Sequence, residues 1–348
     1  MGDRGPMLGD SSGTRRALLR LGFATASTWT AATALAAEQP GDAQAPSGAY
    51  RPPQDIAFKV VEFFSEGVRL QGELFRPASA GAAKLPVILM AHGWGGVAAA
   101  FRPDAVDLAR AGLMVMTFDY RGWGASDSRV VLAGHEPAGQ DDARFAAEVM
   151  ALRGYVDPFE QADDWFNAID WLAGEPTADI ARLGLRGSSF SGGHVVYVAA
   201  RDPRVKAIVS QVGGIADRPP PAAMAGMERR PYVEAAHLHG TEMAWGRERY
   251  PPPFAKTPAN LTGEPVGDKL LRWWPNAEAP YVQAAALFVL AGKDGLVDNR
   301  TNGQRAYERI PGVKNLVVIP DATHFQVYGK YRAQVVGLAI DWFKAHLA

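Results

Sequence analysis

The chain has 348 residues, of which 47% are hydrophobic and 21% charged, so it can bury a full core and is not disordered. Its 36 Lys and Arg residues balance 37 Asp and Glu residues, which removes any overall electrostatic argument for binding nucleic acid or an anionic membrane. The absence of cysteine excludes disulfides, thiolate metal sites and a cysteine nucleophile.

The first 36 residues resemble a twin-arginine export signal. Arg15 and Arg16 precede a weakly apolar stretch rich in Ala and Thr, and Ala34 and Ala36 form the A-x-A pattern of a cleavage site. A retained membrane anchor and a flexible N-terminus without a role are the alternatives, but the Ser and Thr residues of the stretch make a poor bilayer span. We therefore expect residues 1–36 to be a cleaved signal peptide, which predicts a periplasmic or secreted protein without stable membrane insertion.

Residues 37–55 are rich in Pro, Gly and Ala and are predicted to be a flexible segment. Strand-like and helix-like patterns then alternate. The predicted strands are residues 56–64, 68–75, 86–91, 113–118, 182–187, 205–212, 287–291 and 316–319. The predicted helices are residues 101–111, 158–173, 193–201, 301–309 and 332–347. The first two strands form an antiparallel hairpin, and the later apolar runs are typical of strands buried on both faces. The pattern predicts an α/β fold with a doubly wound, mostly parallel sheet.

One long segment, residues 215–281, has no clear strand and carries two proline triplets and many aromatic residues. A structureless loop of this length is improbable in a compact domain, so we expect an inserted helical cap between two parts of the core, residues 56–214 and 282–348. Residues 128–156 form a second, smaller excursion. The predicted cap helices are residues 231–245 and 268–274. Three cap tryptophans are predicted to contact substrate: Trp245, Trp273 and Trp274.

The strongest local motif is the sequence GSSFSGG at residues 187–193, between a predicted strand and a helix. A nucleophilic serine at such a junction occupies a sharp turn and needs small residues two positions before and after it. Gly187 and Ser191 meet this requirement for Ser189, although the usual pattern has glycine at the second position. Ser191 is itself flanked by small residues and is the alternative nucleophile.

A serine nucleophile needs a base, and the base needs a carboxylate that orients it. His324 follows the predicted strand 316–319, and Asp294 follows the predicted strand 287–291. The order Ser, Asp, His, each just past a parallel strand, predicts an assembled catalytic site. Asp298 and Asp217 are alternatives to Asp294.

A glycine-rich sequence, HGWGG at residues 92–96, follows the strand 86–91. Such a loop can aim a backbone N–H at a substrate oxygen, so the N–H groups of Trp94 and Phe190 are predicted to form an oxyanion hole. His92 is interpreted as a residue that fixes the loop. No phosphate-binding loop or clustered metal ligands are present, and no cofactor or metal is predicted.

With these motifs, and with the sequence FDYRGWGASD at residues 118–127, the chain resembles the α/β-hydrolase superfamily. It is most similar to the branch of dienelactone-hydrolase-like and X-Pro-dipeptidyl-peptidase-like proteins. It departs from the dienelactone hydrolases, whose nucleophile is cysteine, and from the dipeptidyl peptidases, which carry extra domains. The resemblance implies a hydrolase and leaves its substrate open.

The hypothesis from the sequence is an exported serine hydrolase that cleaves a small-molecule carboxylic ester through an acyl-enzyme. The aromatic cap predicts an aromatic or apolar group in the substrate. One alternative is an amidase or peptidase that uses the same three residues. The other alternative is a binding protein on a hydrolase fold that turns nothing over.

Overall fold

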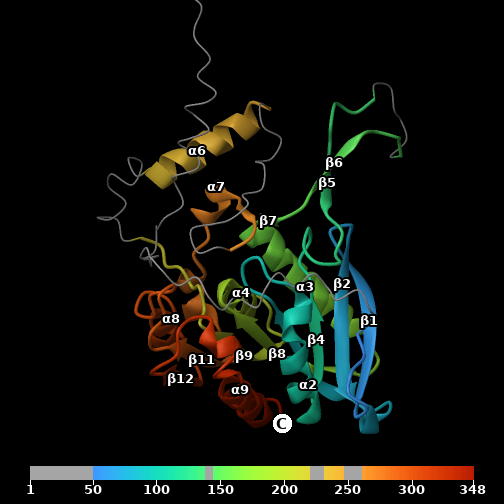
Figure 1. The fold of residues 1–348 in the computed structure, drawn as a ribbon, viewed down its shortest axis with the longest axis vertical. Helices are drawn as coiled ribbons and strands as arrows, with labels where there is room; N and C mark the ends of the chain where they lie inside the picture. The colour runs from blue at the N-terminus through green and yellow to red at the C-terminus, as the bar shows by residue number, and fades with distance from the viewer. Residues whose placement is uncertain (1–49, 138–143, 220–230, 247–260) are drawn as a thin grey trace, which may run out of the picture.

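The computed structural model describes residues 50–137, 144–219, 231–246 and 261–348, and an eight-stranded sheet forms their centre (Figure 1). In spatial order its strands are β1 (Ile56–Ser65), β2 (Val68–Pro77), β4 (Met114–Phe118), β3 (Leu85–Ala91), β8 (Ala178–Ser188), β9 (Val205–Gln211), β11 (Ala285–Ala291) and β12 (Lys314–Ile319). Strand β2 runs antiparallel to both neighbours, and all other pairs are parallel. The predicted α/β class with a mostly parallel sheet is confirmed.

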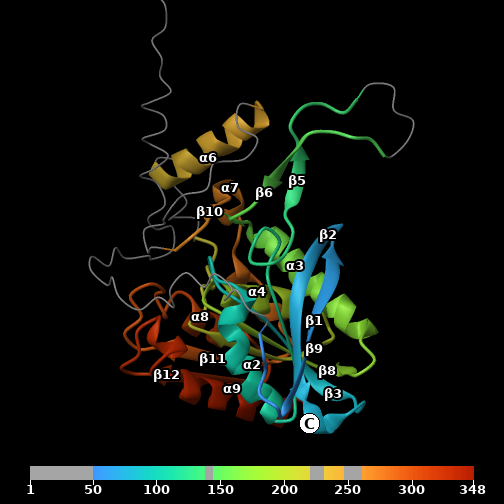
Figure 2. The ribbon, with the colours of Figure 1, turned by 45° about the vertical axis from the view of Figure 1, so that its right-hand side comes forward.

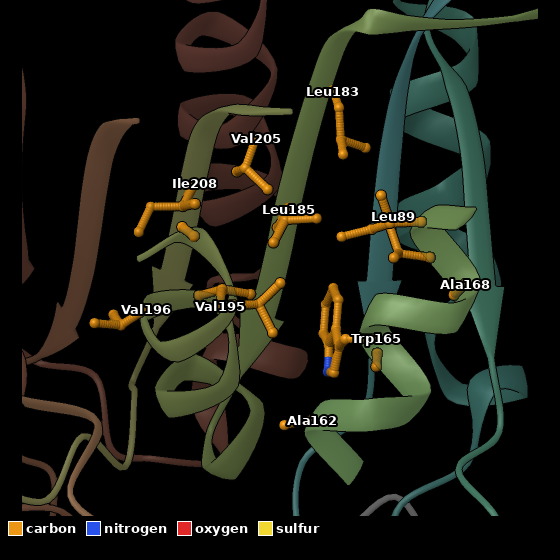
Figure 3. Packing of buried hydrophobic residues seen from close by; sticks show 14 of the residues in the cluster. Leu89, Ala162, Trp165, Ala168, Leu183, Leu185, Val195, Val196, Val205 and Ile208 are labelled. Carbon is orange, nitrogen blue, oxygen red and sulfur yellow. The ribbon is translucent and has the colours of Figure 1, made fainter. Parts of the chain in front are cut away.

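Helices cover both faces of the sheet, which explains the continuous apolar runs of its central strands. The helices α3 (Pro158–Gly174), α4 (Phe190–Ala199) and α8 (Gly303–Arg309) share one buried cluster with the sheet. The helices α2 (Arg102–Arg110) and α9 (Arg332–His346) share another. Figure 3 shows side chains of the first cluster, where Trp165 of α3 lies among Leu89, Leu185 and Val195. Every residue of β4 and β11 is buried, as expected of strands covered on both sides.

Two excursions leave the sheet at the same end of the molecule (Figure 2). One is the hairpin of β5 (Arg129–Leu132) and β6 (Val149–Leu152). The other lies between β9 and β11 and contains α6 (Pro231–Ala244), β10 (Glu264–Pro265) and α7 (Gly267–Leu270). Strand β10 pairs in parallel with β7 (Tyr155–Val156), so the two excursions are joined by main-chain hydrogen bonds. The remaining short helices are η1 (Ala78–Ala80), η2 (Ala98–Phe101), η4 (Pro275–Ala277), η5 (Ala279–Tyr281) and η6 (Gln326–Tyr328).

Several expectations meet the structure only in part. The first predicted cap helix is present as α6, whereas the second is the single turn α7. Helix α4 begins at Phe190 rather than at Gly193. The predicted signal peptide, residues 1–36, lies outside the described residues. No helix within the described ranges is long and apolar enough to cross a membrane.

Candidate active site

Ser189 occupies the turn between β8 and α4 with φ 55° and ψ −122°, a left-handed conformation that costs a non-glycine residue free energy. The turn is tight, because a Cβ added at Gly187 would lie 2.1 Å from the carbonyl oxygen of Ser191. The main chain is held in place by a hydrogen bond of 2.9 Å from the Ser189 N–H to the carbonyl oxygen of Gln211. This geometry is the sharp strand-to-helix turn that the small residues of the motif predict.

His324 lies between Ser189 and Asp294. Its Nε2 is 3.0 Å from the Ser189 Oγ, and its Nδ1 is 2.9 Å from the Asp294 Oδ2. The second carboxylate oxygen, Oδ1, accepts the N–H groups of Leu296 and Val297 at 2.8 and 2.9 Å. A carboxylate can only accept, so Nδ1 carries the imidazole proton and Nε2 is free to accept the serine O–H. The arrangement can therefore move the Ser189 proton to His324 and stabilise the resulting charge with Asp294.

The loops that carry Asp294 and His324 meet because they follow neighbouring parallel strands, β11 and β12. The approach is close: a Cβ added at Gly292 would lie 2.3 Å from the carbonyl oxygen of Pro320. The N–H of Lys293 donates to the carbonyl oxygen of Ala322 at 2.8 Å. Main-chain contacts therefore fix the distance between the carboxylate and the imidazole.

The alternative site residues have other partners in the structure. Ser191 is fully buried and donates its hydroxyl hydrogen to the carbonyl oxygen of His92 at 2.5 Å. Asp298 pairs with Arg300 at 3.2 Å. Asp217 pairs with Arg309 at 2.8 Å. The geometry favours Ser189 and Asp294, because each of them lies within hydrogen-bond distance of His324.

The glycine loop (residues 92–97) lies against the serine, since a Cβ added at Gly93 would be 2.8 Å from the Ser189 Cβ. The carbonyl oxygen of Gly93 accepts the Nδ1–H of His92 at 2.9 Å and the N–H of Gly96 at 3.3 Å. In a trans peptide the C=O and N–H point in opposite directions, so these bonds aim the Trp94 N–H away from His92. The structure thus shows how His92 fixes the loop, as its sequence position suggested.

His92 acts as a neutral hydrogen-bond donor. It is 1% exposed, and this burial lowers the pKa of its imidazole, which keeps the ring uncharged. The other predicted donor, the Phe190 N–H, stands in the first turn of α4, where N–H groups have no acceptor within the helix. The rings of Trp94 and Phe190 pack edge to face with centroids 5.3 Å apart.

A segment of the predicted cap also contacts the glycine loop, a contact for which no local sequence pattern exists. Gly95 has φ 69°, and a Cβ there would lie 2.4 Å from the carbonyl oxygen of Thr262, which belongs to the segment before β10. The next residue, Gly263, has φ 118° and packs against Trp123. The cap segment before β10 therefore lies directly on the glycine loop beside Ser189.

Of the three cap tryptophans predicted to contact substrate, Trp273 requires correction, and the roles of Trp245 and Trp274 stay predictions. Trp273 is 2% exposed and packs in the core against His194 and Tyr197, with ring centroids 4.9 and 4.6 Å away. Trp245 is 70% exposed at the end of α6. Trp274 is half-buried and lies 5.4 Å from the guanidinium of Arg218.

The sequence FDYRGWGASD forms a supporting turn, as expected. The Asp119 carboxylate accepts the N–H of Ala98 at 2.7 Å and of Ala125 at 3.0 Å, which ties the end of the glycine loop to the turn. Arg121 pairs with the buried carboxylate of Asp164 at 2.8 Å. Among the residues that the structure describes, no three His, Cys, Asp or Glu side chains are grouped as a metal site requires.

A doubly wound sheet with a serine at the strand-to-helix turn, and an aspartate and a histidine after later strands, defines an α/β hydrolase. Residues 66–220 match the family model of X-Pro dipeptidyl-peptidase (S15 family). An uncharacterized 31.7 kDa protein of Escherichia coli, from the traX-finO intergenic region, is 30% identical over 311 residues, which cover 81% of this chain and 97% of that protein. The chain belongs to the α/β-hydrolase superfamily, and part of it matches the X-Pro dipeptidyl-peptidase family.

Two further comparisons are informative. Thiohydrolase aneE of Aspergillus aculeatus is 30% identical over 159 residues, which cover 45% of this chain and 42% of that protein. The solved structure of the α/β hydrolase GrgF from Penicillium sp. sh18 superposes with a TM-score of 0.64 at 21% identity, covering 84% of this chain and 99% of the other. The second likeness is one of fold.

Proposed function

We propose that the protein is a serine hydrolase that cleaves a small-molecule carboxylic ester through an acyl-enzyme. The observation that carries the proposal is the position of His324, within hydrogen-bond distance of both Ser189 and Asp294. His324 takes the Ser189 proton as Oγ attacks the acyl carbon, and the N–H groups of Trp94 and Phe190 hold the oxyanion. His324 then protonates the leaving alkoxide as its C–O bond breaks. Water, deprotonated by His324, releases the acid and regenerates Ser189.

The acyl group is proposed to be apolar. The aromatic rings of Trp94 and Phe190 belong to the same two residues whose N–H groups would hold the oxyanion, which supports an apolar surrounding for the acyl chain. A thioester is the second candidate substrate, because two of the relatives are named thiohydrolases. Its attack needs the same residues, and a thiolate leaves with less help from the acid.

Turnover of p-nitrophenyl esters from acetate to decanoate by the chain from Ala37 tests the proposal, with acyl thioesters and an aminoacyl p-nitroanilide measured alongside. We expect ester turnover that falls by at least about 10³-fold in Ser189→Ala, since the nucleophile is lost. A fluorophosphonate should label Ser189. Labelling at Ser191, or undiminished turnover in Ser189→Ala, would contradict the assignment. Hydrolysis of the anilide alone would favour a peptidase. A protein that is neither labelled nor able to turn over any of these substrates would favour the binding-protein alternative.

The carboxylate assignment has a matched control. Asp294→Asn should lower kcat by about 10⁴-fold, because the amide favours the wrong imidazole tautomer. Asp298→Asn changes the same group four residues away, where the carboxylate pairs with Arg300. This variant should retain kcat within about two-fold, since it does not touch His324. Equal losses in the two variants would contradict the role of Asp294.

We also propose that the protein is exported. The support is the Arg15-Arg16 pair followed by an apolar stretch and the A-x-A sequence that ends at Ala36.

A further inference from the structure

Three buried side chains form a chain of hydrogen bonds that ends on the glycine loop. The Nε1–H of Trp165 donates to the Oη of Tyr120 at 2.8 Å, and Tyr120 Oη lies 2.5 Å from Ser191 Oγ. Ser191 Oγ lies 2.5 Å from the carbonyl oxygen of His92. All four residues are at most 1% exposed. Trp165 starts the chain from α3, where Figure 3 shows its indole turned toward the sheet.

The direction of the chain follows from its two ends. An indole N–H can only donate, and a carbonyl oxygen can only accept. Ser191 must therefore use its hydrogen on His92, and Tyr120 must use its own on Ser191. Every hydroxyl hydrogen is committed, so the two hydroxyls have a single arrangement and cannot rotate to other partners. Burial raises the pKa of the Tyr120 phenol, which keeps this hydrogen in place.

The chain joins the two segments that carry the proposed oxyanion donors. Ser191 directly follows Phe190 in α4, and His92 begins the glycine loop that presents the Trp94 N–H. The carbonyl of His92 is held by Ser191, and the next carbonyl, that of Gly93, is held by the His92 imidazole at 2.9 Å. One peptide group of the loop is thus bonded to the helix, and the next is held by the His92 ring within the loop.

We propose that Tyr120 and Ser191 are positioning residues that set the distance between the Trp94 and Phe190 N–H groups, with Trp165 orienting Tyr120. This inference rests on the proposed function, because the two N–H groups matter only if an oxyanion forms at Ser189. It assigns the Ser191 hydroxyl, at the unusual final position of the serine motif, to the alignment of the oxyanion hole.

The test removes one hydroxyl at a time, with Tyr120→Phe and Ser191→Ala. Loss of a whole oxyanion donor costs about 10²- to 10³-fold in kcat, so a misaligned donor should cost about 10-fold. KM for the p-nitrophenyl ester should stay within about two-fold, because the oxyanion exists only after attack. The rate of Ser189 phosphonylation by a fluorophosphonate should fall by a similar factor. The double variant should lose no more than the worse single variant, since both changes break one chain.

Ser210→Ala is the matched control. Ser210 is also fully buried and donates its hydroxyl to a carbonyl of α4, that of Gly192 at 3.1 Å, but it does not reach the glycine loop. Ser210→Ala should lower the melting temperature about as much as Ser191→Ala does, and it should retain kcat within about two-fold. Losses of kcat in Ser191→Ala and Tyr120→Phe no larger than in Ser210→Ala, or losses confined to KM, would overturn the proposal. A wild-type protein that neither hydrolyses esters nor reacts with the fluorophosphonate would instead overturn the proposed function.

Discussion

The main chain of Ser189 stores strain that glycine would relieve. Its φ of 55° and ψ of −122° suit glycine, whereas any residue with a Cβ is disfavoured there. We expect Ser189→Gly to be more stable than Ser189→Ala by about 1 kcal/mol, although both lack the nucleophile. Urea unfolding of the two variants measures the difference. Equal free energies of unfolding would mean that the turn is not strained in solution.

The buried imidazole of His194 makes the free energy of unfolding depend on pH. His194 is a fully buried residue of α4, its Nε2 lies 3.1 Å from the carbonyl oxygen of Pro158, and burial lowers its pKa from 6.5 to about 3. Between these two pKa values the unfolded chain binds a proton that the folded protein does not, so stability falls as the pH falls. The effect is largely absent above pH 6.5.

From pH 7 to pH 5 this residue should remove about 2 kcal/mol from the free energy of unfolding. His194→Gln keeps a donor for the Pro158 carbonyl but does not titrate. Urea unfolding measures the free energy of unfolding at pH 7 and at pH 5. The decrease between the two pH values should be about 2 kcal/mol smaller in His194→Gln than in the wild type. The same pH dependence in both proteins would show that other groups dominate.

At the scale of elements, the contact between the glycine loop and the cap segment is testable. Gly95→Ala places a methyl group against the main chain of Thr262, which cannot move aside as a flexible side chain could. We expect kcat to fall at least about 10-fold and the free energy of unfolding to fall by about 1 to 3 kcal/mol. Ester turnover and urea unfolding measure the two effects.

Gly67→Ala is the matched control for Gly95→Ala, because it introduces backbone strain without a collision with other atoms. Gly67 has φ 84°, in the turn between β1 and β2, and no atom lies within 4 Å of an added Cβ. This variant should lose about 1 kcal/mol of stability and none of the activity. If Gly95→Ala behaved in the same way, the cap segment would not be coupled to the loop.

The elements that the sequence predicts best are those buried on both faces. The apolar runs that became β3, β4 and β11 leave little ambiguity, because a strand of that composition has to be covered on both sides. The hairpin of β5 and β6 was not predicted, since it is short and much of it is exposed. The early start of α4 was missed for another reason. Gly192 and Gly193 are poor helix formers, but added Cβ atoms there would collide with the main chain at Gly213 and Gly214.

For the candidate site, the positions of Ser189, Asp294 and His324, each just past a parallel strand, predict their proximity, and the structure brings the three side chains together. The residues around them were harder to assign. Trp273 was expected to face substrate and packs in the core, because an aromatic side chain suits both environments equally well. The buried contacts of Tyr120 and Ser191 depend on tertiary packing, for which no local pattern exists.

At the scale of the whole molecule, export gives a separate prediction. In a bacterial host with a twin-arginine pathway, we expect the periplasmic protein to begin at Ala37 by N-terminal sequencing. Changing Arg15 and Arg16 together to lysine should leave the precursor in the cytoplasm. The matched control changes Arg4 and Arg20 to lysine, which alters the same number of arginines outside the pair. Equal export of both double variants would contradict the twin-arginine assignment.

The separation of the reacting groups along the chain also determines when activity can appear. The serine lies 135 residues before its base, and the strand that carries the base, β12, is the last in the sequence. Closing so long a loop must precede the Ser189 to His324 contact. A ribosome that has made only the first two thirds of the protein therefore carries a serine without a partner. In the proposed mechanism synthesis and reactivity are therefore separated in time, because a growing chain that still lacks His324 has no base for Ser189.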